Sequence, residues 1–111
     1  MNQLELNDFF ANKEFIENTI SQLIKDFNRC GLEVDFELNA ILPIKEELTN
    51  QIASRLIQLS ATELQQFIYT VDLQENIFLN AVTMSDDFKT LANEILKREA
   101  LKVFIRSNYS E

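Results

Sequence analysis

The chain has 111 residues, of which one is glycine, one is proline and none is histidine, and its net charge is −8. The scarcity of glycine and proline disfavours hairpins and phosphate-binding loops, and the lack of histidine removes the commonest general base and metal ligand. The negative charge disfavours nucleic acid and anionic membranes, which are bound by Lys and Arg. We therefore predict an all-α protein, a compact single-domain bundle over residues 1–111 with four to five helices of mixed length.

The apolar content of 46% is sufficient for a packed core. Residues 1–88 contain 15 acidic and 5 basic residues, a net charge of −10, and the rest of the chain is mildly basic. Cys30 is the only cysteine, so no intramolecular disulfide can form and we expect a cytoplasmic protein. We see neither a signal peptide nor an apolar run long enough to span a membrane. We predict no cofactor.

Apolar residues at three- and four-residue steps predict a first helix from about Lys13 to Cys30. Asn12 is a suitable N-cap for this helix. Gly31 follows at the position where a residue with positive φ usually ends a helix. The predicted buried stripe consists of Ile16, Ile20, Leu23, Ile24, Phe27 and Cys30.

Residues 32–39 alternate between apolar and polar types, which is the pattern of a strand. A strand here would pair with residues 4–6 or with the same segment of a second copy. Such a strand would also place its three acidic residues on one face. They are then the one candidate set of oxygen ligands for a metal in the sequence, although acidic residues in this pattern are more commonly solvated. The alternative is an extended connection followed by a short helical turn from Asp35. We favour this alternative, because paired acidic strands repel.

Pro43 is expected to open a second helix near residues 43–59, since proline fits the first helical turn. Ser60 and Glu63 have the spacing of a capping box and predict that a short third helix starts after Ser60. Asp72 and Glu75 repeat this spacing and predict a further helical piece. Thr83 or Ser85 then offers a start for the last helix, near residues 86–106.

The last helix carries an unusual distribution of charge. Its apolar face, which includes Leu91 and Ile95, continues at 100° per residue into Glu99, Lys102 and Arg106. Leu101, Phe104 and Ile105 point to the opposite side. Charges on an inner face need partners, because an unpaired buried charge is costly.

Four interpretations compete for this region. The charges lie in water because the end of the helix is frayed or turned, which we favour; they form an internal ion-pair network; they form a partner or self-association surface with the neighbouring apolar residues; or they form a catalytic or anion-binding site. Arg98 or Arg106 is also expected to reach Asp72 or Glu75 across a helix contact. The resulting candidate interface or ion-pair site is Asp72, Glu75, Arg98, Glu99, Lys102, Phe104, Ile105 and Arg106.

The lack of catalytic motifs, the acidity and the surplus apolar residues at both ends favour a non-enzymatic protein–protein interaction module, such as an adaptor, a regulator or an immunity-type inhibitor. One alternative is a small-molecule-binding or carboxylate-dependent enzymatic bundle with a pocket near Asp72, Glu75 and Arg98. Another is an obligate homodimer with a structural role. We expect a protein partner or self-association, and neither nucleic acid nor a membrane.

Overall fold

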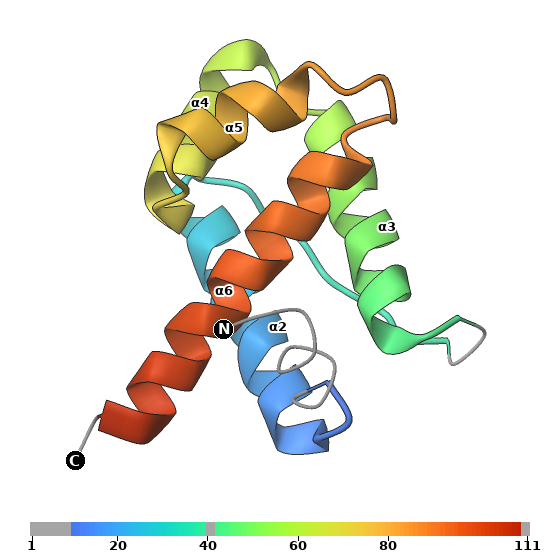
Figure 1. Ribbon diagram of the computed structural model, residues 1–111, viewed down its shortest axis with the longest axis vertical. Coiled ribbons are helices and arrows are strands. Elements are labelled where there is room, and N and C mark those ends of the chain that lie inside the picture. Colours follow the sequence, from blue (N-terminus) through green and yellow to red (C-terminus); the bar gives the residue numbers. More distant parts are fainter. Residues whose placement is uncertain (1–9, 40–41, 110–111) are drawn as a thin grey trace.

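The computed structural model describes residues 10–39 and 42–109. Of residue 109 it describes only the backbone. Within these ranges all regular structure is helical, and the predicted compact all-α bundle with helices of mixed length is confirmed. Figure 1 shows the arrangement of the helices. They are α2 (Lys13–Arg29), α3 (Ile44–Ile57), α4 (Ala61–Val71), α5 (Glu75–Val82) and α6 (Lys89–Tyr109).

The longest helix, α6, is the centre of the bundle. It runs diagonally through the view of Figure 1 and contacts α2, α3, α4 and α5. Its buried stripe combines large aliphatic side chains with two alanines. Full burial of each large aliphatic side chain contributes about 1.5–3 kcal/mol to folding. The stripe consists of Leu91, Ala92, Ile95, Leu96, Ala100 and Val103.

A second packing centre joins α2 to α4 through aromatic rings. Phe27 and Phe67 are both completely buried, and their rings are stacked with centroids 3.9 Å apart. Phe36 packs at a tilt against Phe27, with centroids 6.3 Å apart. At the other end of α2, buried Phe10 meets Phe15 edge to face. These contacts fix how α2 lies against the rest of the bundle.

The sequence signals for the ends of α2 and the start of α4 are confirmed. Asn12 Oδ1 accepts a hydrogen bond from the backbone N–H of Phe15 at 3.1 Å, and Gly31 has a φ of +77° after the last turn of α2. Ser60 and Glu63 form both bonds of a capping box. Each such cap contributes about 1 kcal/mol.

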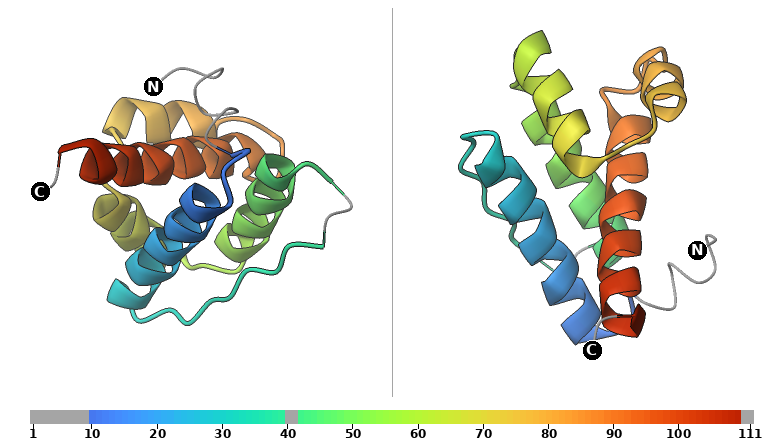
Figure 2. Two further views of the ribbon diagram at one scale, coloured as in Figure 1. Left: turned by 90° about the horizontal axis from the view of Figure 1, so that it is seen from below. Right: turned by 90° about the vertical axis from the view of Figure 1, so that its left-hand side faces the viewer.

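The segment 32–39 is extended but pairs with no strand among the described residues. Side chains of α3 satisfy its backbone instead: Gln51 Oε1 accepts from the N–H of Glu37 at 2.9 Å, Gln51 Nε2 donates to the Glu37 carbonyl, and Arg55 donates to the Asp35 carbonyl. Figure 2 shows the segment crossing outside the helices from α2 towards α3. Its inward residues are Leu32, Val34 and Phe36.

The alternation of apolar and polar residues in this segment is therefore explained by an extended chain that packs one of its faces against the core. The predicted helical turn from Asp35 is wrong for residues 35–39, and residues 40–41 lie outside the described ranges. The backbone needs neither a strand partner nor a helix, because polar side chains of α3 bond it directly.

Three predicted helix boundaries are wrong. Asp72 has a left-handed φ of +64° and ends α4, while Gln74 precedes α5 without a side-chain cap, so Asp72 and Glu75 form no second capping box. Asp87 and Phe88 are also left-handed, with φ of +56° and +65°, which delays the start of α6 until Lys89. The second helix starts after Pro43 as expected but stops at Ile57, before the predicted end at 59.

Candidate functional site

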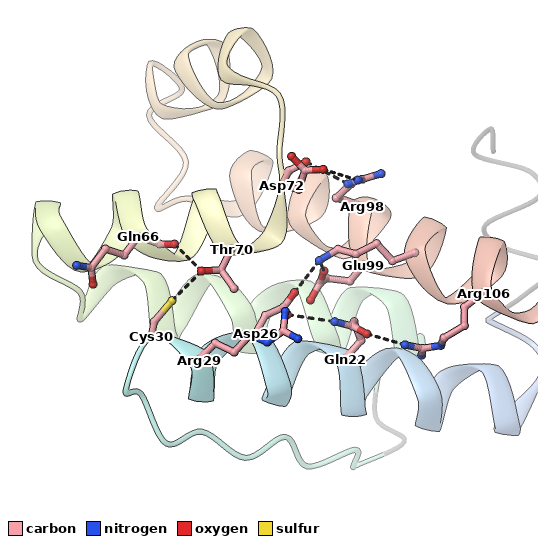
Figure 3. A network of polar contacts seen from close by, with 11 residues as sticks. Gln22, Asp26, Arg29, Cys30, Gln66, Thr70, Asp72, Arg98, Glu99 and Arg106 are labelled. Atoms are coloured by element: carbon pink, nitrogen blue, oxygen red, sulfur yellow. Dashed lines mark hydrogen bonds and ion pairs between the residues drawn. The ribbon is translucent and has the colours of Figure 1, made fainter. Parts of the chain in front are cut away.

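The predicted site residues lie in three places around α6 rather than in one. Figure 3 shows Arg98 reaching the end of α4 at Asp72, whereas Glu99 and Arg106 face Gln22 and Asp26 of α2. Phe104 packs half-buried against the core, and Ile105 is 43% exposed. The long helix therefore separates a surface cluster from an internal one.

Arg98 clamps the end of α4 onto α6. Its Nε donates to the Asp72 carbonyl oxygen at 3.1 Å, and its Nη2 donates to Asp72 Oδ2 at 2.9 Å. The left-handed conformation of Asp72 turns both acceptors towards α6, because the chain leaves the helix at this residue. The Asp72 side chain nevertheless remains 81% exposed, so the pair is a surface ion pair.

Beside this clamp lies an open groove of about 640 Å³ between α4 and α5. The two helices diverge from the turn that joins them (Figure 2). Tyr69 stands at the groove with 89% of its surface exposed, and Asp72 and Glu75 are its charged lining residues. The full lining is Gln65, Ile68, Tyr69, Asp72, Leu73, Gln74, Glu75 and Phe78.

The internal cluster joins α2 to α6 through one lysine and two buried carboxyl groups. Asp26 and Glu99 are completely buried, and Lys102 Nζ lies 2.7 Å from Asp26 Oδ2 and 2.7 Å from Glu99 Oε1. Gln22 donates to Asp26 Oδ1 at 3.1 Å and accepts from Arg106 at 3.0 Å. These contacts connect residues 22–26 of α2 with residues 99–106 of α6.

Burial and the neighbouring Asp26 raise the pKa of Glu99 to about 9, although Lys102 acts in the opposite direction. Neither carboxyl oxygen of Glu99 accepts a hydrogen bond from the described residues, since the contact with Lys102 is close but poorly directed. Glu99 is therefore protonated at neutral pH. Asp26 then faces two cations, Lys102 at 2.7 Å and Arg29, whose Nη1 lies 4.0 Å from Asp26 Oδ1.

The favoured interpretation of a frayed, solvated end is wrong for Glu99, which is buried within a helix that continues to Tyr109, whereas Arg106 is exposed. The partners on α2 were missed at the sequence level. Their signal was nevertheless present: Gln22 and Asp26 are four residues apart and adjoin the apolar stripe at Leu23 and Phe27.

Glu75 makes no ion pair or side-chain hydrogen bond with the described part of the chain. Arg106 was expected to reach Asp72 or Glu75, but it bonds Gln22 instead. Among residues 10–39 and 42–109 no three acidic or cysteine side chains are gathered to hold a metal ion. The segment 32–39 therefore presents no metal site. None of the helices described here combines the length and the apolar character that crossing a membrane requires.

The fold and these contacts define an all-α bundle with a solvent-facing groove on one side of its central helix and a buried ion-pair cluster on another. No family model, curated protein or solved structure matches the chain.

Proposed function

We propose that this protein is a non-enzymatic interaction module that binds a partner protein in the groove between α4 and α5. The observation that carries this proposal is the exposure of Tyr69, at 89%, beside a groove whose lining includes Ile68, Leu73 and Phe78. Tyrosine is enriched at protein interfaces because its ring contributes apolar contact area and its hydroxyl remains able to bond. A partner that covered the groove would bury this ring.

A small molecule is the second candidate occupant, because the volume of about 640 Å³ falls within the range of small-molecule sites. Such sites bury most of their ligand. Here Tyr69 and the Asp72 side chain stand largely in water, so a small ligand would stay exposed along one side. A protein segment, which brings its own surface to cover the rim, fits this shape better.

The test is affinity capture from the native host with the tagged full chain, followed by mass spectrometry. We expect Tyr69→Ser to lose a partner that the unmodified chain retains. Ile57→Ser is the matched control, because Ile57 is another exposed apolar residue, at 55%, and lies on α3 outside the groove. Both variants should melt at the temperature of the unmodified chain, since neither side chain is in the core.

A partner that survives Tyr69→Ser but is lost with Ile57→Ser would contradict the proposal. Light scattering on the purified chain tests the homodimer alternative. A mass near 12.9 kDa that does not change with concentration is expected, and a stable mass of twice that value would assign the exposed apolar groups to self-association.

A further inference from the structure

We infer that the occupant of the groove between α4 and α5 is a basic amphipathic segment of the partner, with an apolar side chain flanked by lysine or arginine. This inference rests on the proposed function and names the chemistry of the partner. It follows from three properties of the groove: its apolar floor, the sign of its charges and the state of its carboxylates.

The floor of the groove suits an apolar side chain. Ile68 is buried, and Leu73 and Phe78 are partly buried and packed against the core, so each presents some surface to the groove. Their positions are fixed by that packing, which means that a guest would meet a pre-formed surface. Pre-formed apolar surface lowers the entropic cost of binding.

The charges of the groove select the sign of the guest. Among the described residues that line it, the charged ones are Asp72 and Glu75. Arg98 beside the groove pairs with Asp72, so Glu75 is the acid whose charge is not offset. Asp72 and Glu75 also belong to the part of the chain, residues 1–88, that carries a net charge of −10. An acidic segment would be repelled on approach, whereas a basic segment would be attracted and oriented.

The two carboxylates have capacity left for a guest. The Glu75 carboxylate makes no ion pair with the described residues, and Asp72 uses Oδ2 for Arg98 while its side chain stays 81% exposed. Arg98 also bonds the Asp72 carbonyl, so it holds the carboxylate in place beside the groove. The second oxygen of Asp72 and both oxygens of Glu75 are then available to cationic side chains.

The experiment uses two synthetic helical peptides of about 14 residues, or about four turns. Each has leucine on one face, and the other face carries lysine in one peptide and glutamate in the second. Binding to the full chain is measured by fluorescence anisotropy. We expect the lysine peptide to bind and the glutamate peptide not to bind, and Tyr69→Ser to weaken the binding.

The double variant Asp72→Asn/Glu75→Gln should weaken the lysine peptide about fivefold or more, because it removes both carboxylate partners. The double variant Glu33→Gln/Glu37→Gln removes the same total charge from an exposed segment outside the groove and should change the affinity less than about twofold. Asparagine tolerates the left-handed conformation of Asp72, so the fold is preserved. Glu75→Gln alone, which leaves the turn untouched, should give part of the same loss.

Equal weakening by the two double variants would overturn the inference, because it would show attraction by net charge alone. Binding of the glutamate peptide, or failure of the lysine peptide to bind, would overturn it as well. If the captured native partner depends on Tyr69 but not on Asp72 and Glu75, the proposed function stands and the basic occupant is rejected.

Discussion

Lys102 Nζ on α6 lies 2.7 Å from Asp26 Oδ2 on α2, between residues that are 76 positions apart in the sequence. Because Glu99 beside them is protonated at neutral pH, Asp26 is the acidic partner of Lys102, and Arg29 Nη1 approaches the other oxygen of Asp26 at 4.0 Å. The contact joins the two helices. It also means that replacing Lys102 and Asp26 together should cost less stability than replacing Lys102 alone.

We expect Lys102→Met to destabilise the protein by roughly 2–4 kcal/mol at pH 7, because it removes the nearer cation of the completely buried Asp26 carboxylate and leaves only the more exposed Arg29, whose Nη1 lies 4.0 Å from Asp26 Oδ1. Methionine keeps most of the aliphatic part of the lysine side chain, so the loss of stability measures the effect of removing the positive charge. Urea unfolding measures the change. The double variant Asp26→Asn/Lys102→Met should be more stable than Lys102→Met alone, and a double variant that loses the sum of both single changes would contradict the pairing.

Glu99 should make stability depend on pH. Its pKa is about 9 in the folded protein and near its ordinary value of 4.5 when unfolded, so the folded state holds a proton that the unfolded state releases between these values. Its contribution to stability is thus complete below about pH 4.5 and is lost as the pH rises towards 9. Melting curves across this range measure the slope.

Glu99→Gln removes this dependence, since glutamine stays neutral at every pH. We expect the variant to gain on the order of 1–3 kcal/mol relative to the unmodified chain near pH 8 and to gain little near pH 5. Glu33→Gln, at an exposed position, serves as the control for general charge effects. A gain of equal size at both pH values would show that Glu99 does not hold the proton.

The stability of the protein should depend on the backbone conformation at Asp72 and only weakly on the ion pair between Asp72 and Arg98. We expect Asp72→Asn to cost less than about 1 kcal/mol, because an exposed pair contributes little and asparagine accepts a positive φ. Asp72→Ala should cost about 1 kcal/mol more, since alanine is strained at a φ of +64°. Thermal unfolding of the two variants distinguishes them, and equal melting temperatures would contradict the left-handed turn.

Phe104 and Ile105 lie side by side in sequence but should differ in their effect on stability. Phe104 packs against the core, so Phe104→Ser is expected to cost roughly 2–3 kcal/mol, which is a fall of about 10 °C or more in melting temperature. Ile105 is 43% exposed, and Ile105→Ser should cost less than about 1 kcal/mol. Similar losses for both would place Ile105 in the core.

The sequence predicted the fold class and several boundaries because those depend on local chemistry. Asn12, Gly31 and the Ser60–Glu63 box act within one turn of the chain, and each is found where the pattern indicated. The turns at Asp72, which ends α4, and at Asp87, which precedes α6, were missed, because in both an aspartate takes the left-handed conformation for which glycine is the usual signal.

The candidate site was less predictable because its contacts are not local. The pattern showed that Glu99 and Lys102 continue the inner face of the last helix, but not that Asp26 faces them from α2. Likewise, Asp72 and Glu75 share a groove only because α4 and α5 diverge there. Such placement depends on how the helices pack, and helical spacing within one segment carries no information about it.

Hydrogen–deuterium exchange of the full chain, with and without the captured partner, tests the groove most directly. We expect slower exchange in the complex at the backbone amides of residues 65–78, and unchanged exchange along α3. Protection confined to the end of α6 around Ile105, or to residues 32–39, with no change at 65–78, would contradict the assignment of the groove between α4 and α5 as the binding surface.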